Sequence, residues 1–282
     1  FLGREDELQR LRQWADHQRY PIAVLYGFGG NGKTTIQQKA GEEFVHGPNC
    51  PLRWPYEGAV WVSASDYIRG HPRLKDILIV IAETFDLYAS LIKGDLRTIQ
   101  QDLLKRDVKE LLEKQRILVL LDNYETVSKA NQVETLQFFN SIRGTSQVLI
   151  STRYRPDWFL KQDNENIYRM VHVLIHVDGL SAENTKKMVQ EFLRTKELPP
   201  NVADEKDVLH LAKITQNNPK TILVLLGLVE QGMSLSQLLE KISSQTADVN
   251  HVFDLIIDYT WKEMLSKDEK NVLMTKALFN HS

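Results

Sequence analysis

The chain has 282 residues, 42% apolar and 26% charged, which is typical of globular proteins and excludes wholesale disorder. Its 35 Lys and Arg and 37 Asp and Glu give a net charge of −2. The basic excess of a dedicated nucleic-acid-binding domain is therefore missing, and we expect no nucleic-acid partner. One cysteine, Cys50, excludes a disulfide framework and favours a cytoplasmic protein. The longest apolar run, 222–229, is too short for the ~20 residues of a membrane-spanning helix, so no membrane contact is expected.

Helices and strands are predicted to alternate over the first 179 residues. Short apolar runs bounded by turns predict strands, and apolar residues at helical spacing predict the helices between them. The predicted strands are 22–26, 59–62, 117–121, 148–150 and one within 171–177, and the predicted helices are 5–19, 33–45, 73–87, 96–113 and 131–142. This alternation predicts an α/β fold, a parallel sheet with helices on both of its faces.

After Gly179 the pattern becomes helical throughout. The predicted helices are 182–196, 204–215, 219–231, 234–243, 251–265 and 267–279, with a polar linker at 243–247. We expect three domains: 1–179, 180–245, and a third at 250–282 that is cut short. The sequence begins at Phe1 rather than at Met, and we interpret it as a piece of a longer protein whose flanks are absent.

The strongest motif is GFGGNGKT at 27–34, which matches the P-loop pattern between a predicted strand and a predicted helix. Its glycines allow several backbone N–H groups to converge on one anion at the positive end of the helix. We expect Lys33 to reach the β- and γ-phosphates, Thr34 to coordinate Mg²⁺ and Thr35 to reach the α-phosphate. The full set of expected phosphate-loop contacts is Gly27, Gly29, Gly30, Asn31, Gly32, Lys33, Thr34 and Thr35.

Two further strand ends carry candidate residues. The apolar run 117–121 ends in Asp122, as in a Walker B strand, and a carboxylate at the tip of a buried strand can hold Mg²⁺. The run 148–150 leads to Arg153, where a cation can sense or stabilise the charge of a γ-phosphate. We therefore assign catalytic roles to Lys33, Asp122 and Arg153, and magnesium coordination to Thr34 and Asp122.

These motifs together resemble the STAND-class P-loop ATPases of the NB-ARC type. That family includes plant disease-resistance proteins, apoptotic protease-activating factor, and bacterial signalling and defence regulators. The opening FLGRE at 1–5, the loop 27–35, the strand segments 59–63, 118–125 and 149–153, and Asn218-Pro219 carry the resemblance. It covers about residues 1–245, while 250–282 resembles the start of a winged-helix domain.

The resemblance implies a sheet in the order 2-3-4-1-5, followed by a helical ARC1-like domain. It also implies that Leu2 and Arg4 lie against the adenine and ribose, and that Pro219 packs on the adenine. The implied activity is that of a switch that rests with ADP, opens and self-associates with ATP, and so regulates effector and sensor domains outside this sequence.

The sequence also departs from the family pattern. The acid that usually follows the Walker B aspartate is replaced by Asn123, which cannot take a proton from water, so hydrolysis is expected to be slow. Glu125 could substitute only if the loop bends back, and we expect instead a solvated loop glutamate. The glycine of the "Gly-x-Pro" segment is replaced by Asn217, which tolerates the left-handed conformation. The family's histidine that contacts ADP lies beyond the end of this sequence.

Other residues favour ordinary structural roles. Cys50 lies in a proline-rich loop without a nearby histidine, and we expect His172 and His176 to be strand residues rather than metal ligands. Tyr154, Trp158 and Phe159 are expected to pack rather than to stack on bases.

Three other functions are compatible with parts of this pattern. A constitutive AAA+-like motor or loader acting on nucleic acid or protein would share the motifs but normally needs an acid next to Asp122. A phosphotransferase would need a short lid, which the long helical segment after Gly179 does not resemble. A scaffold that has lost nucleotide would not need Lys33 and Thr34.

Overall fold

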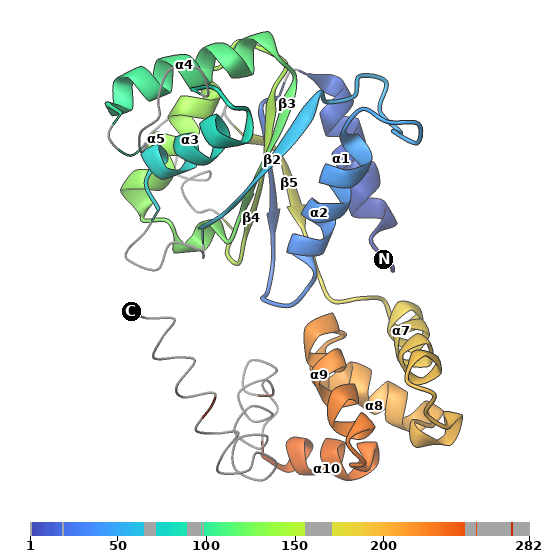
Figure 1. The fold of residues 1–282 in the computed structure, drawn as a ribbon. Coiled ribbons are helices and arrows are strands. Elements are labelled where there is room, and N and C mark those ends of the chain that lie inside the picture. Colours follow the sequence, from blue (N-terminus) through green and yellow to red (C-terminus); the bar gives the residue numbers. More distant parts are fainter. Residues whose placement is uncertain are drawn as a thin grey trace. The chain divides into compact units, whose positions relative to one another are not determined.

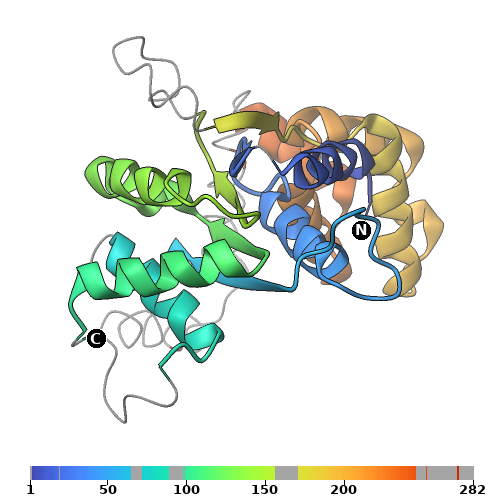
Figure 2. The same ribbon diagram turned by 90° about the horizontal axis from the view of Figure 1, so that it is seen from above.

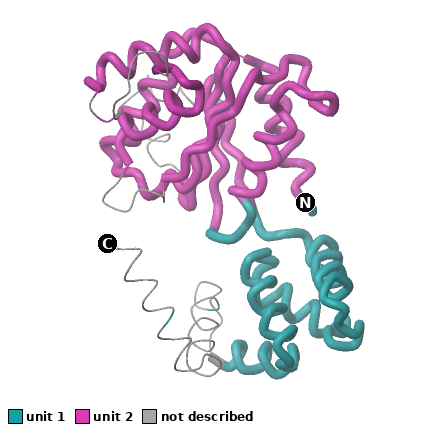
Figure 3. Tube along the Cα trace, in the orientation of Figure 1, with its two compact units in different colours: residues 1–3, 29–32, 178–282 teal, residues 4–28, 33–177 magenta. Residues whose placement is uncertain are grey.

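The computed structural model describes residues 2–18, 20–64, 72–88, 97, 99–155, 171–245, 252 and 272. The chain forms two compact units (Figure 3). The sheet unit contains 4–28 and 33–177, and the helical unit contains 1–3, 29–32 and 178–282. The helices predicted at 251–265 and 267–279, and with them the expected start of a winged-helix domain, lie outside the described residues except for Val252 and Val272.

The sheet unit is a five-stranded parallel sheet with helices before and between its strands. The strand order is β2-β3-β4-β1-β5, which confirms the order implied by the resemblance, and every neighbouring pair is parallel. Its elements in chain order are α1 (Glu5–His17), β1 (Ile22–Tyr26), α2 (Lys33–Phe44), β2 (Gly58–Ser63), α3 (Leu74–Thr84), α4 (Gln101–Lys114), β3 (Ile117–Asp122), η3 (Tyr124–Thr126), α5 (Lys129–Asn140), β4 (Gln147–Thr152) and β5 (Val171–His176).

Helices cover both faces of this sheet because successive strand residues point to opposite sides. In β3, Val119 and Leu121 pack into one apolar core, and Leu118 and Leu120 pack into another. The first core is completed by α3, α4 and α5, and the second by α1 and α2 (Figure 1). Figure 2, seen from above, shows the teal and green helices on one side of the strands and the blue helices on the other. The predicted α/β class is confirmed.

The register of the sheet brings the carboxyl ends of its central strands together. Tyr26 at the end of β1 lies opposite Thr152 of β4 and His176 of β5, and Asp122 at the end of β3 lies opposite Ser63 of β2. In open α/β sheets ligands bind at this edge. The phosphate loop begins after β1, Asp122 is the last residue of β3 and Arg153 follows β4, so Thr34, Asp122 and Arg153 lie at one edge of the sheet.

The helical unit contains four α-helices among its described residues. Its elements are α7 (Ala182–Thr195), η5 (Pro200–Val202), α8 (Glu205–Thr215), α9 (Pro219–Glu230) and α10 (Leu235–Gln245). The side chains of Ser181, Asp204 and Asn218 cap three of the helices by accepting a hydrogen bond from the third helical N–H. The apolar faces of the four helices meet in one core around Leu211, Leu225 and Leu239.

Several helix ends differ from the predictions, and three of them have a clear cause. Helix α4 begins at Gln101 rather than near 96, because Gln100 is extended. Helix α3 ends at Thr84 rather than near 87, because Asp86 is left-handed. Helix α10 continues to Gln245, into the predicted linker. There the hydroxyls of Ser243 and Ser244 donate to the carbonyls of Leu239 and Lys241, which satisfies these polar side chains within the helix.

No helix among the described residues is long and apolar enough to cross a membrane.

Candidate functional site

The loop after β1 needs glycine at two positions. At Gly27, φ is +149° and an added Cβ would lie 2.3 Å from the Val177 carbonyl oxygen. At Gly30, φ is +86° and an added Cβ would lie 2.7 Å from both Asn218 Oδ1 and Lys220 Cβ. No L side chain fits such contacts without a shift of the neighbours. The curled loop that the motif predicts is therefore present, and it ends where α2 begins at Lys33.

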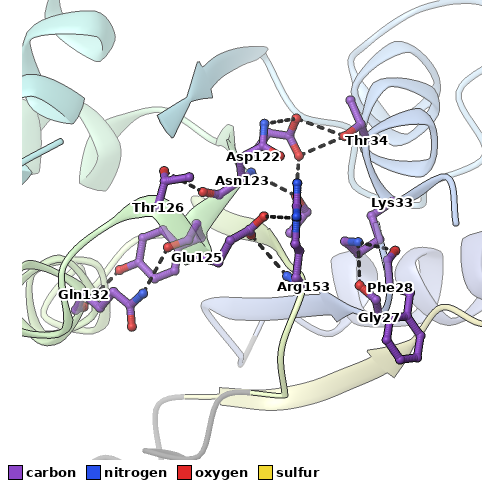
Figure 4. A network of polar contacts seen from close by, with 12 residues as sticks. Gly27, Phe28, Lys33, Thr34, Asp122, Asn123, Glu125, Thr126, Gln132 and Arg153 are labelled. Atoms are coloured by element: carbon purple, nitrogen blue, oxygen red, sulfur yellow. Dashed lines mark hydrogen bonds and ion pairs between the residues drawn. The ribbon is translucent and has the colours of Figure 1, made fainter. Parts of the chain in front are cut away.

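Lys33 lies across the start of the loop. Its Nζ donates hydrogen bonds to the carbonyl oxygens of Gly27 at 2.7 Å and Phe28 at 2.9 Å (Figure 4). Its side chain is buried, and this burial lowers the pKa of the ammonium group. Among the neighbouring charges, Glu125 opposes the lowering most, and Asp122 opposes it less. A partly desolvated cation of this kind interacts strongly with an anion placed beside it.

Thr34 and Asp122 meet as predicted. The Thr34 hydroxyl donates to both carboxylate oxygens of Asp122, at 3.1 and 3.0 Å. Asp122 is 3% exposed, and the Ser151 hydroxyl of β4 donates to its Oδ1. The side-chain amide of Asn123 donates to Oδ2 at 3.2 Å. These donors hold the carboxylate at the tip of β3, facing the first turn of α2.

The expectation of a solvated Glu125 was wrong. Asn123 adopts the left-handed conformation, with φ 56°, and turns the chain back after β3. The Glu125 side chain is 13% exposed, its Oε1 lies 3.0 Å from Nε of Arg153, and its Oε2 accepts from the Arg153 N–H at 3.1 Å. Arg153 follows β4 as predicted, with its side chain 60% exposed and paired with Glu125 (Figure 4).

The tip of the phosphate loop makes a second set of contacts, within the helical unit. The side-chain amide of Asn218 donates to the carbonyl oxygen of Gly29 and to Oδ1 of Asn31, both at 2.8 Å. Its Oδ1 caps α9 by accepting from the Thr221 N–H at 3.1 Å. Asn217 has φ 57°, which confirms that asparagine replaces the family's glycine in a left-handed turn, and Pro219 begins α9. One side chain thus serves both the loop and the helix.

Three more residues of the predicted site, Leu2, Arg4 and Thr35, lie near the starts of α1 and α2. Leu2 is half-buried, and Thr35 points outward from α2 and is exposed. Arg4 is buried before α1, where its Nη1 lies 2.9 Å from Oε1 of Glu7.

Comparison with models of protein families shows which family the chain belongs to. The model of the NB-ARC domain matches residues 4–197, a range that includes the phosphate loop, Asp122 and Arg153. The chain belongs to the NB-ARC domain family. Nucleotide binding by a P-loop is the property that this family implies.

The chain is similar to several known proteins. An uncharacterized WD repeat-containing protein from Nostoc sp. is 26% identical over 179 residues, which are 59% of this chain and 14% of that protein. A Signal Transduction ATPase with Numerous Domains (STAND) protein with a tetratricopeptide repeat sensor from Pyrococcus horikoshii has a TM-score of 0.57. The two are 21% identical, over 99% of this chain and 35% of that one. The ORC1 protein of Aeropyrum pernix, solved in complex with DNA, has a TM-score of 0.55 at 16% identity, over 99% and 72% of the two chains.

The two structural likenesses show the shared fold alone, since both identities are low. The NB-ARC chain spans only small parts of the first two proteins.

The residues present fit a magnesium–nucleotide group. The Thr34 hydroxyl and the Asp122 carboxylate are hard oxygen donors, the kind that Mg²⁺ prefers. The neighbouring Lys33 supplies a cation, and the loop is built so closely that Gly27 has no room for a Cβ. The backbone N–H groups of such a loop donate hydrogen bonds to a bound anion.

The sequence did not predict the roles of three polar residues of the NB-ARC site. Gln37 is fully buried one turn after Lys33, and its amide donates to the carbonyl oxygens of Leu121 and Leu149, at 3.1 and 2.8 Å. It thereby ties α2 to both β3 and β4. The sequence does hint at this role, because Gln37 is an amide on the apolar face of α2, between Ile36 and Ala40. The contacts of Ser151 and Asn218 join distant parts of the chain and left no local signal.

The other sequence candidates add no site. Cys50 is half-buried and donates to the Phe44 carbonyl oxygen at 3.6 Å, and the His176 ring lies 4.8 Å from that of Tyr26. No cluster of three metal-ligating side chains occurs in the part of the chain that the structure describes. Trp158, Phe159 and the side chain of His172 lie outside it. The expectation that Tyr154 packs was wrong, because its side chain is exposed.

Proposed function

We propose that this NB-ARC chain is an adenine-nucleotide-controlled switch. It holds ADP at rest, exchanges it for ATP, then opens and self-associates, and so regulates effector and sensor segments of a longer protein. The units in this proposal are a nucleotide-binding domain at 1–179, an ARC1-like helical domain at 180–245, and the start of a winged-helix domain at 250–282.

The observation that carries the proposal is the double role of Asn218. Its amide holds the carbonyl oxygen of Gly29 and the side chain of Asn31, and its carbonyl oxygen caps α9. The backbone of the loop is the part of a P-loop that meets phosphate. A change in the bound phosphates that moves this loop would therefore act on the first turn of α9. Such a connection supports a role in which the nucleotide state is transmitted rather than only consumed.

Individual roles follow from the chemistry of each group. Lys33 would bind the β- and γ-phosphates, and Arg153 would sense the γ-phosphate. Thr34 and Asp122 would hold Mg²⁺, which neutralises phosphate charge when bound. Leu2, Arg4 and Pro219 would contact the adenine and ribose. The remaining phosphate contacts would come from Gly27, Gly29, Gly30, Asn31, Gly32 and Thr35.

The alternative is a constitutive AAA+-like motor or loader acting on nucleic acid or protein. The fold that the chain shares with the Aeropyrum pernix ORC1 protein, which was solved with DNA, favours keeping this function in view. Asn123 argues against it, because such a motor normally carries an acid at the position next to Asp122. The two functions differ in whether nucleotide is retained or turned over.

The test is the nucleotide content of the purified chain. After denaturation, the released nucleotide is separated by ion exchange for the unmodified chain, for Lys33→Ala, and for Lys39→Ala as the matched control. Lys39 lies on the same helix but pairs with Glu43 at the surface. Stoichiometric ADP in the unmodified chain and in K39A, but not in K33A, supports the switch. An empty unmodified chain that hydrolyses added ATP steadily would overturn it in favour of the motor.

A further inference from the structure

The position that should carry the water-activating acid is occupied by an amide that supports Asp122. The Nδ2 atom of Asn123 donates to Asp122 Oδ2 at 3.2 Å, and its backbone N–H donates to Ser151 Oγ at 3.3 Å. A side chain that accepts a proton from water therefore has to be a residue other than Asn123. The structure offers a carboxylate from the same turn.

The turn after β3 is fixed from both ends. Thr126 donates from its N–H and from its hydroxyl to the Asn123 carbonyl oxygen, at 3.0 and 2.9 Å. Gln132 of α5 donates to the carbonyl oxygens of Tyr124 and Val127, at 3.0 and 2.9 Å. Tyr124 is buried, and its hydroxyl donates to the Gln132 carbonyl oxygen at 3.0 Å. These hydrogen bonds fix the backbone of the turn, and so they restrict the directions in which the Glu125 side chain can point.

The Glu125 side chain points to the end of β4, and its charge acts on Lys33. Both of its oxygens contact Arg153, one at the backbone N–H and one at Nε. In the view of Figure 4, the Arg153 side chain is drawn between Glu125 and Lys33. The charge of Glu125 also acts on Lys33 more strongly than that of Asp122 does. Since β4 lies beside β1 and the phosphate loop follows β1, a carboxylate held by Arg153 at the end of β4 lies at the edge of the sheet where a γ-phosphate would bind.

We propose that Glu125 is the proton acceptor for ATP hydrolysis in this chain and that Arg153 is the residue that positions it. In this step the oxygen of a water molecule attacks the γ-phosphorus, and one water proton passes to a carboxylate oxygen of Glu125. The bond from the γ-phosphorus to the β–γ bridging oxygen breaks, and the electron pair stays on ADP. The proton then leaves Glu125 for the released phosphate or for solvent. The inference rests on the proposed binding of ATP.

The test compares Glu125→Gln with Glu134→Gln as the matched control. Glutamine keeps the size of the side chain and can still accept from the Arg153 N–H, so the turn should be preserved. Glu134 pairs with Lys105 within the same unit and lies outside the network. We expect E125Q to bind ATP as the unmodified chain does but to hydrolyse it at least ~100-fold more slowly. E134Q should retain both properties.

A second readout does not depend on turnover. Hydrogen exchange at the Arg153 amide reports its bond to Glu125, so Glu125→Ala should accelerate this exchange in the nucleotide-free chain while E134Q leaves it unchanged. Arg153→Ala should lower the hydrolysis rate, and Arg153→Lys should restore part of the rate. If E125Q hydrolyses ATP as fast as E134Q, the inference is wrong although the switch stands. If the unmodified chain binds no ATP, the proposed function itself fails.

Discussion

Replacing Asn218 by alanine tests the link between the phosphate loop and α9. The change removes the cap of α9 and the two hydrogen bonds to Gly29 and Asn31. Loss of a cap costs about 1 kcal/mol, and each of the two other bonds contributes about 1 kcal/mol. We therefore expect Asn218→Ala to lower the opening free energy of α9 by about 3 kcal/mol.

The matched control is Ser181→Ala. Ser181 caps α7 in the same unit by accepting from the Asn184 N–H, at 3.1 Å. Its loss should cost α7 only about 1 kcal/mol. Asn218→Ser, which retains a capping oxygen but not the amide donors to the loop, should fall between the two.

The assay is hydrogen exchange of the nucleotide-free chain, followed by mass spectrometry on peptides from α7 and α9. A difference of about 2 kcal/mol between the two alanine variants corresponds to about a thirtyfold difference in the loss of protection. If Asn218→Ala accelerates exchange in α9 no more than Ser181→Ala does in α7, the contacts with the loop contribute nothing. The reasoning about Asn218 would then be refuted.

Three further outcomes are expected. Gly30→Ala should destabilise the chain more than Gly32→Ala in thermal unfolding, because both residues have positive φ but only at Gly30 would a Cβ meet other atoms; equal losses would contradict this. Gln37→Leu removes two hydrogen bonds from buried strand carbonyls. Urea unfolding should therefore show a free energy of unfolding lower by about 2–4 kcal/mol. For Gln38→Leu, at the exposed neighbouring position, the loss should be less than about 0.5 kcal/mol. Ser151→Ala should weaken magnesium-dependent nucleotide binding about tenfold in calorimetry, since the hydroxyl orients Asp122; unchanged affinity would remove this role.

The sequence predicted what depends on local pattern. Apolar runs located all five strands, because a strand buried on both faces is apolar at nearly every position, as the fully buried β3 shows. Thr34 and Asp122 came together as predicted, since the carboxyl ends of parallel strands share an edge. The strand order itself came from the family resemblance.

The sequence did not predict contacts between residues that are far apart along the chain. Glu125 was expected in solvent because a glutamate in a loop usually is, and its direction depends on the left-handed Asn123 together with Arg153, 28 residues away. Asn218 was noted only as a neighbour of Pro219, whereas its amide reaches residues 187 and 189 positions earlier. The helix-terminal differences reflect backbone angles at single residues, such as Asp86, that composition does not determine.

The most direct test of the switch compares hydrogen exchange in the first turn of α9 with ADP and with a non-hydrolysable ATP analogue bound to the same chain. The account predicts that the amides of Thr221 and Ile222, which donate to Asn218, exchange at different rates in the two states, and that Asn218→Ala abolishes the difference. Identical exchange with both nucleotides, under conditions in which both are shown to be bound, would contradict the claim that the nucleotide state reaches the helical unit.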